Sequence, residues 1–382
     1  MEQDNRSLPK YEQILQDLLN RIRLGDFTYD VPFCTEKQLC DDYSVSRITA
    51  KRAITDLEHR GILYRKRGVG SFVVKNHTGN LNSSSPVKTT DSKTIAFLLP
   101  FDISKGGLFA AVESVNQVLN EKGYFLSLHI SSINFAKEKN NLKLLLSQNI
   151  SGLIYYPVRD KYNLNLLNEF VFQGKPVVVM DKDINCPYIH NVIADNFNGG
   201  WLLAEHLVSL GHQNIAFITT APIDDLSSVR NRFGGYLRYL QSSGIKPSPA
   251  NLVYFPYQLI DGVDLKPEYE LYCNQLKSLY DSGITAVICE NDQVAYFTHK
   301  ACRHLGLSIP DDLSICGFDN NEWALRPENG ITTINQNFPR MGEKIGEILL
   351  ESVTNPSAQI SRITLPVSLV ARGSTGLPRV VS

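Results

Sequence analysis

Four side chains able to hydrogen-bond to a base edge or a phosphate stand close together near residue 50: Arg47, Thr49, Lys51 and Arg52. The apolar residues of the same stretch recur at the i, i+3, i+4, i+7 spacing of one helix face: Ala50, Ala53, Ile54 and Leu57. Ser46 occupies the N-cap position, where its hydroxyl can accept from free amides of the first turn. The pattern predicts a helix with its polar residues outward. There Arg47 can donate to O6 and N7 of a guanine, whereas Lys51 and Arg52 suit phosphates.

The residues around this helix complete a winged helix-turn-helix. In chain order they predict a helix at 8–23 and a second helix from the Thr35/Gln38 capping box to about residue 43. The helix that begins after Ser46 comes third and ends at Gly61. Two strands follow, at 62–64 and 71–74. The turn between the strands is basic, and Gly68 and Gly70 allow a close approach to a phosphate.

Charge is concentrated in this region. Residues 47–75 hold eight Lys or Arg and two acids, a local charge of 8 − 2 = +6, while the whole chain has −1. A basic run alone equally suits a solvated face, and Arg52 could instead pair with Asp56 at i+4. The surrounding pattern favours contact with a nucleic acid.

Length and composition limit the classes of protein to which the chain can belong. With 382 residues, 43% hydrophobic and 20% charged, the chain is globular and has more than one domain. No apolar run reaches the roughly 18–20 residues of a membrane span, and residues 1–10 show no apolar signal segment. The seven cysteines are scattered and never spaced as CxxC. We therefore expect a cytoplasmic protein with reduced thiols, no metal site, no cofactor and no membrane partner.

Residues 76–93 are polar and rich in Ser, Thr and Asn, and we interpret them as a linker between a domain at 1–75 and one at 94–382. Beyond the linker, apolar runs alternate with helical patterns, which is typical of parallel sheets covered on both faces. The segment is too long for one such sheet, so we expect two α/β lobes with ligands at the carboxyl ends of the strands. The runs are 95–99, 125–130, 152–155, 177–180, 215–218, 252–255, 286–289 and 314–318.

The N-terminal motifs resemble those of the GntR family of bacterial transcription regulators. The matching segments are Leu8-Pro9-Lys10-Tyr11, Thr35-Glu36-x-x-Leu39, Val45-Ser46-Arg47-x-Thr49, Ala53-Ile54-x-x-Leu57, Gly61-Ile62-Leu63 and Gly68-x-Gly70-x-Phe72-Val73. The resemblance implies a domain that binds double-stranded operator DNA. It places DNA contacts at Lys37, Arg47, Thr49, Lys51, Arg52, Arg67 and Gly68, and the charge of the wing adds Lys66.

Residues from about 94 to 375 resemble the LacI/GalR effector domain. The matching segments include Asp195-Asn196-x-x-Gly199-Gly200, Gly211-His212-x-x-Ile215-Ala216, Arg232-x-x-Gly235-Tyr236, Asn291-Asp292-x-x-Ala295, Gly317-Phe318-Asp319 and Leu369-Val370-x-Arg372-Gly373-Ser374. The resemblance implies an α/β fold with two lobes, like that of periplasmic binding proteins, and a small-molecule effector bound between them.

The same resemblance assigns effector contacts. Those expected to hydrogen-bond to a sugar are Arg232, Asn291 and Asp319. A guanidinium donates to two hydroxyls, a carboxylate accepts from two, and an amide does both. Those expected to form apolar walls are Leu108, Phe109, Tyr257 and Phe338. Asp195 could be a ligand or a residue that orders a turn.

A GntR-type head joined to a LacI-type sensor is the arrangement of arabinose repressors. It implies a homodimer that grips a near-palindromic operator and is released by a carbohydrate such as arabinose. An alternative is that a purine or sugar phosphate acts as co-repressor. Arg230, close to Arg232 in the sequence, keeps this alternative open because basic residues around the cleft would suit a phosphate. An enzyme is disfavoured because the chain has no Walker A, GxSxG or HExxH motif and no GxGxxG after a strand. A transport-type sugar-binding protein is disfavoured by the missing signal segment and the DNA-binding head.

Overall fold

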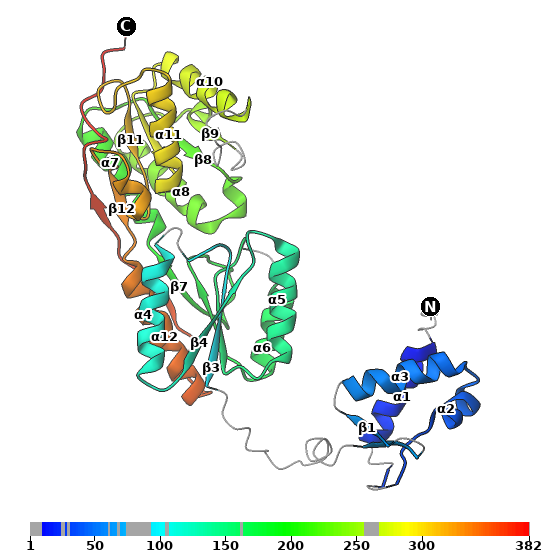
Figure 1. Ribbon diagram of the computed structural model, residues 1–382. Helices are drawn as coiled ribbons and strands as arrows, with labels where there is room; N and C mark the ends of the chain where they lie inside the picture. The colour runs from blue at the N-terminus through cyan, green and yellow to red at the C-terminus, as the bar shows by residue number, and fades with distance from the viewer. Residues whose placement is uncertain are drawn as a thin grey trace, which may run out of the picture. The chain divides into compact units, whose positions relative to one another are not determined.

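The computed structural model describes residues 10–23, 27–28, 31–59, 62–66, 69–73, 93–103, 107–160, 163–255 and 267–381 (Figure 1). The chain divides into two compact units, unit 1 (residues 1–91) and unit 2 (residues 92–382). The linker expected at 76–93 lies outside the described residues, apart from Lys93. Within the described part, no helix is long and apolar enough to cross a membrane, and no group of His, Cys, Asp and Glu side chains is arranged to hold a metal ion.

The described part of unit 1 consists of α1 (Lys10–Arg23), α2 (Glu36–Tyr43), α3 (Arg47–His59), β1 (Leu63–Lys66) and β2 (Gly70–Val73). The capping box predicted at the start of α2 is present: Gln38 N donates to the Thr35 hydroxyl at 3.2 Å, and Thr35 N donates to Gln38 Oε1 at 3.0 Å. The apolar stripe of α3 is buried against α1. β1 and β2 form an antiparallel hairpin, and β2 is also bridged to Cys34, so the hairpin is attached to the segment before α2.

Unit 2 has two lobes, each built on a parallel sheet. The sheet of lobe 1 has the order β13-β7-β6-β5-β3-β4, and α4 and α12 cover one face while α5 and α6 cover the other (Figure 1). Its strands are β3 (Thr94–Leu99), β4 (Phe125–Ile130), β5 (Gly152–Tyr155), β6 (Val177–Met180), β7 (His190–Ala194) and β13 (Arg362–Leu365). Its helices are α4 (Leu108–Asn120), α5 (Phe135–Ser147), α6 (Leu164–Phe172) and α12 (Phe338–Thr354).

The sheet of lobe 2 has the order β11-β10-β8-β9, with α7 and α8 on one face and α10 and α11 on the other. Its strands are β8 (Ile215–Thr219), β9 (Leu252–Tyr254), β10 (Ala286–Cys289) and β11 (Ser314–Cys316). Its helices are α7 (Asn196–Ser209), α8 (Ser227–Ser242), α10 (Pro267–Asp281) and α11 (Asp292–His304). Short 3-10 turns are η2 (Ile223–Asp225), η3 (Pro249–Asn251) and η4 (Glu322–Leu325), and β12 (Thr333–Asn335) pairs antiparallel with β14 (Ser368–Val370).

The chain passes between the lobes three times: from β7 to α7, from β12 to α12, and from β13 to β14. Two glycines bring α7 and α8 into close contact beside these crossings. A Cβ at Gly200 would lie 1.9 Å from the carbonyl oxygen of Arg232, and one at Gly235 would lie 1.9 Å from that of Phe197. Any side chain there would separate the two helices and displace Arg232.

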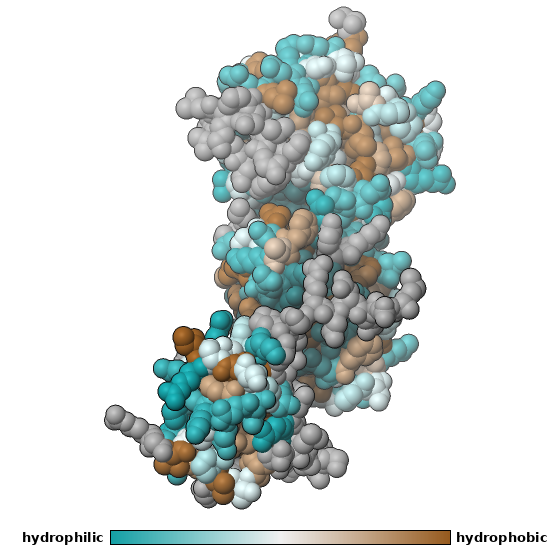
Figure 2. Space-filling view, turned by 90° about the vertical axis from the view of Figure 1, so that its right-hand side faces the viewer, coloured by the Kyte–Doolittle hydropathy of each residue, from teal (hydrophilic) through white to brown (hydrophobic). Residues whose placement is uncertain are grey.

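The space-filling view shows a mostly hydrophilic surface over the residues that are drawn in colour (Figure 2). Hydrophobic residues gather on the visible face of lobe 2, which is the upper part of that view. On lobe 1 the edge strand β4 also leaves large apolar side chains exposed, with Phe125 at 69% and Leu128 at 39%. Unit 2 therefore carries apolar surface outside its own core.

Candidate functional site

The first turn of α3 presents the polar residues that the sequence assigned to DNA. Arg47 and Lys51 are exposed, and Thr49 is half-buried. Thr49 N donates to the Ser46 hydroxyl at 3.3 Å, so Ser46 caps the helix as predicted. Ile48 is 81% exposed, although it is apolar. An exposed apolar residue on a recognition helix can contact the methyl group of thymine, which makes Ile48 a candidate that the sequence analysis missed.

Two other basic residues of unit 1, Arg52 and Lys66, lie against aromatic rings of the protein. The guanidinium of Arg52 lies over the Tyr11 ring, 4.1 Å from its centroid. Lys66 Nζ lies 4.8 Å from the ring centroid of Phe72. Lys37 is exposed on α2, while Arg67 and Gly68, both expected at the wing, lie outside the described residues. The exposed members of this set remain able to contact phosphates.

A cleft of about 460 Å³ lies between the two lobes of unit 2. Its aromatic walls come from Phe101, Phe135, Tyr156, Tyr254, Trp323 and Phe338. Its charged lining residues are Arg159, Asp181, Lys182, Arg232, Glu290 and Asp319. Apolar faces combined with a few convergent polar groups are typical of a small-molecule site.

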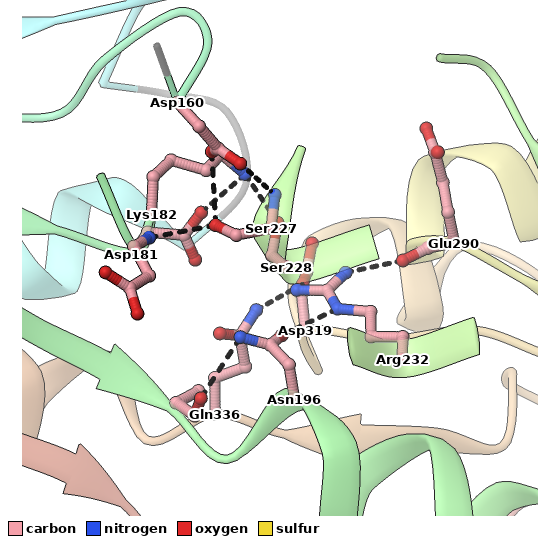
Figure 3. A network of polar contacts seen from close by, with 12 residues as sticks. Asp160, Asp181, Lys182, Asn196, Ser227, Ser228, Arg232, Glu290, Asp319 and Gln336 are labelled. Carbon is pink, nitrogen blue, oxygen red and sulfur yellow. Dashed lines mark hydrogen bonds and ion pairs between the residues drawn. The ribbon is translucent and has the colours of Figure 1, made fainter. Parts of the chain in front are cut away.

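Arg232, on α8, is held in a single orientation. The residue is 5% exposed, Nε donates to Asn196 Oδ1 at 2.8 Å, and Nη1 donates to the carbonyl oxygen of Glu290 (Figure 3). Nη2 lies 3.5 Å from Asp319 Oδ1, and the guanidinium stacks over the Phe318 ring at 3.7 Å from its centroid. A buried guanidinium fixed in this way can offer its remaining donors to a ligand at a defined place.

Asp319 faces Arg232 and is joined to Gln336, whose Nε2 donates to Asp319 Oδ1. Burial raises the pKa of Asp319 to about 7, although the Arg232 charge opposes the rise. Its backbone has a φ of +116°, a strained conformation for a residue with a side chain. Gln336 is 1% exposed, and its Oε1 has no hydrogen-bond partner among the described residues. This unpartnered acceptor leaves a place for a donor from a ligand.

Of the other predicted effector residues, the structure brings Asn291 and Phe338 to the cleft and leaves Asp195 out of it. Asn291 lines the cleft, but its side chain caps α11 by accepting from Val294 N at 2.9 Å. Phe338 lines the cleft at 7% exposure. Asp195 caps α7 by accepting from Asn198 N at 2.9 Å and is not among the lining residues.

The walls expected after the first strand also lie elsewhere. Leu108 begins α4 and is fully buried in the core of lobe 1, while Phe109 is 60% exposed on the same helix. Phe101, directly after β3, lines the cleft in their place. Tyr257 lies outside the described residues.

A second polar group joins lobe 1 to the first turn of α8 (Figure 3). Asp160 accepts from Ser227 N at 2.5 Å and from Ser227 Oγ at 3.1 Å. Lys182 donates to Ser228 Oγ at 2.6 Å and pairs with Asp181 at 2.8 Å. Burial alone would raise the pKa of Asp181, but the charges of Lys182 and Arg232 outweigh it and lower the pKa. The two lobes are thus bridged by charged and hydroxyl groups that are shielded from water.

Several of these residues were not predicted: Asp160, Asp181, Lys182, Glu290 and Gln336. Asp181 and Lys182 directly follow β6, and Glu290 directly follows β10. Since ligands of parallel sheets bind at the carboxyl ends of the strands, the residues after each apolar run were a usable signal. Gln336 follows β12, a three-residue strand without an apolar run.

A winged helix-turn-helix joined to a two-lobed α/β unit with a polar cleft defines a ligand-responsive transcription regulator. Two protein families match the chain: bacterial regulatory proteins of the gntR family over residues 10–73, and a periplasmic binding protein-like domain over residues 204–375. The arabinose metabolism transcriptional repressor of Geobacillus stearothermophilus is 31% identical over 382 residues, covering 97% of this chain and 98% of that protein.

Two solved structures share the fold of unit 2. A LacI family transcriptional regulator from Enterococcus faecium with bound ribose has 26% identity and a TM-score of 0.62, covering 74% of this chain and 98% of its own. The lac repressor dimer bound to operator and the anti-inducer ONPF has 25% identity and a TM-score of 0.59, covering 74% of this chain and 94% of that one.

The chain therefore belongs to the family of bacterial transcriptional repressors that combine a GntR-type DNA-binding domain with a periplasmic-binding-protein-like domain. Its predicted fold class is confirmed. It is a DNA-binding transcription regulator and not an enzyme.

Proposed function

We propose that this chain is a transcriptional repressor that a neutral sugar, in the first place arabinose, releases from its operator. The charge balance of the cleft carries the proposal. Each cation of the described lining has an acid within ion-pair distance: Arg159 with Asp225 at 3.1 Å, Lys182 with Asp181 at 2.8 Å, and Arg232 with Asp319 at 3.5 Å. Arg159 and Lys182 are paired with acids, and Arg232 already donates to Asn196 and to the Glu290 carbonyl oxygen, so the lining favours an uncharged ligand rich in hydroxyl groups over a sugar phosphate.

The proposed sugar site consists of Arg232, Asp319, Gln336, Asn291 and Phe338. Arg232 donates to hydroxyl oxygens, while Gln336 Oε1 and Asp319 accept from hydroxyl hydrogens. The Phe338 ring supplies an apolar face for the carbon side of the sugar. Arg230, which could have favoured a phosphate, is exposed, does not line the cleft and lies 3.9 Å from Asp160.

The repressor acts as a homodimer in the bacterial cytoplasm, with one head on each half of a near-palindromic operator. A dimer of the related lac repressor is bound to its operator in the solved structure described above. Exposed apolar side chains such as Phe125 and Leu128 on the edge strand β4 are surface that a second copy would bury. The sugar releases DNA only if it binds the lobe arrangement that is incompatible with the operator more tightly than the competent one.

Thermal melting of the full-length protein against separate sets of pentoses, hexoses, disaccharides, sugar phosphates and purines tests the proposal. A ligand at 100 times its Kd stabilises the native state by about 2.7 kcal/mol and raises Tm. We expect the largest shift with arabinose, and release of labelled operator DNA by the same sugar. A shift only with purines or sugar phosphates would replace the proposal with a co-repressor, and a sugar that tightens operator binding would reverse its sign.

A further inference from the structure

The first turn of α8 has no capping side chain of its own. Leu226 occupies the N-cap position, and its side chain cannot accept a hydrogen bond. Asp160, which belongs to lobe 1, stands at this helix end instead and accepts from both Ser227 N and Ser227 Oγ. A carboxylate here satisfies a free amide and meets the positive end of the helix dipole. The cap of a helix in lobe 2 is therefore supplied from the other lobe.

This cap is buried, and the Ser227 hydroxyl that it binds has a second hydrogen-bond partner in lobe 1. Asp160 is 3% exposed and Ser227 is 2% exposed. Ser227 Oγ also accepts from Asp183 N of lobe 1 at 2.8 Å, so the hydroxyl bonds to lobe 1 both as donor and as acceptor. If the lobes separated, the first turn of α8 would lose these partners together. The contacts consequently exist only in the lobe arrangement seen here.

The same helix carries Arg232, whose guanidinium is fixed at the floor of the cleft. Figure 3 shows the two contact groups side by side, with Asp160 and Ser227 above and Arg232, Asn196 and Asp319 below. Arg232 lies five residues after Ser227 on the same helix, which is about 1.4 turns, so a shift of the capped end also shifts the point where Arg232 enters the cleft.

We propose that Asp160 is a positioning residue for effector binding: a helix cap, supplied across the cleft, that couples the lobe arrangement to the position of Arg232. The inference rests on the proposed function in one respect, namely that the ligand of the cleft is a sugar. Asp160 is not required to touch that sugar.

Arabinose titrations of the full-length protein by calorimetry test the proposal. We expect Asp160→Ala to weaken arabinose binding about tenfold, since the cap and its coupled contacts are lost. Asp160→Asn keeps one oxygen that can accept from Ser227 N but loses the acceptor used by Ser227 Oγ, so its affinity should fall clearly less than that of the Ala variant. Wild-type affinity in the Ala variant, or an equal loss in the Asn variant, would overturn the proposal.

A second readout needs no ligand. The chain has two tryptophans, of which Trp323 lines the cleft and Trp201 packs on Tyr239, so Trp201→Phe leaves Trp323 as a reporter of the cleft. In that background, Asp160→Ala should increase acrylamide quenching of Trp323 because the lobes separate more often. Unchanged quenching would contradict the cap across the cleft.

Ser352→Ala is the control, because Ser352 Oγ lies 3.1 Å from His190 Nε2 entirely within lobe 1 and neither residue lines the cleft. The control variant should lower Tm without changing the quenching or the arabinose affinity. If it changed both the quenching and the affinity, the effect of Asp160→Ala would be explained by general destabilisation. If the wild type binds no arabinose while the quenching still responds to Asp160→Ala, the sugar assignment fails and the cap stands. If arabinose binds and neither readout responds, the cap fails and the proposed function stands.

Discussion

Among single residues, Asp319 combines burial with a raised pKa of about 7. Its ordinary value is 3.8, so the folded state binds this proton more tightly than the unfolded state. The resulting stability is fully present below about pH 4 and is lost as the pH rises through 7. We expect Asp319→Asn to remove this loss, so that the unfolding free energy of the variant relative to wild type increases from pH 4 to pH 8, by at most about 4 kcal/mol. Urea titrations at several pH values measure the difference, and parallel pH profiles would contradict it.

Arg47 carries the specificity prediction for DNA. Its exposed guanidinium at the first turn of α3 can form two hydrogen bonds with a guanine, so Arg47→Ala should cost about 1–3 kcal/mol of discrimination between operator and unrelated DNA. Fluorescence anisotropy with both duplexes measures the loss. Arg47→Lys keeps the charge without the fork and should retain binding to unrelated DNA. An equal loss on both duplexes would instead make Arg47 a phosphate contact.

The residues of the cleft could be predicted where they belong to a family motif. Arg232 and Asp319 belong to such motifs, and the structure brings both to the cleft. Leu108 and Phe109 could not be placed from the sequence, because the phase of α4 relative to the strand before it depends on packing against the core of lobe 1. Asp160 gave no motif at all, since its role depends on a helix more than sixty residues later in the chain.

At the scale of elements, the apolar runs predicted the strands with a continuous apolar stretch, the edge strands β4 and β9 included, and missed β7, β12, β13 and β14. β7 shows the reason. It begins with two polar residues that are buried because distant groups bind them: His190 Nε2 lies 3.1 Å from Ser352 Oγ, and Asn191 Nδ2 donates to the Lys182 carbonyl oxygen at 2.8 Å. Polar residues satisfied by tertiary partners interrupt the apolar signal on which the prediction depends.

The wing offers a prediction about how elements are held together. Arg65, on β1, pairs through Nε with Glu58 of α3 at 3.0 Å and through Nη1 with Glu36 of α2 at 3.2 Å. Lys66, the next residue, lies on the other face of the strand over Phe72. Arg65 therefore braces the wing against both helices, and Lys66 is the wing cation of the described residues that is placed for a phosphate.

We expect Glu58→Gln to weaken operator binding severalfold, even though it removes a negative charge near DNA. A purely electrostatic role for this region predicts the opposite, because lost repulsion should tighten binding. Asp41→Asn is the control: Asp41 is exposed on α2, and its loss changes the charge equally without touching the brace. Anisotropy titrations with labelled operator compare the two variants. Tighter binding in both would show that the ion pairs of Arg65 do not support operator binding.

At the scale of the whole molecule, the proposed repressor links a sugar site and a DNA site that lie in different units. Linkage requires each ligand to change the affinity of the other by the same factor, typically about 5–150-fold. We therefore expect saturating operator to weaken arabinose binding by the factor with which saturating arabinose weakens operator binding, as measured by calorimetry and anisotropy. Arg47→Ala should bind arabinose normally, and an operator concentration that just saturates the wild type should weaken that binding less than it does in the wild type, because less of the variant is bound to DNA. If arabinose binds free and operator-bound wild type equally well, it cannot be the releasing effector, however tightly it binds.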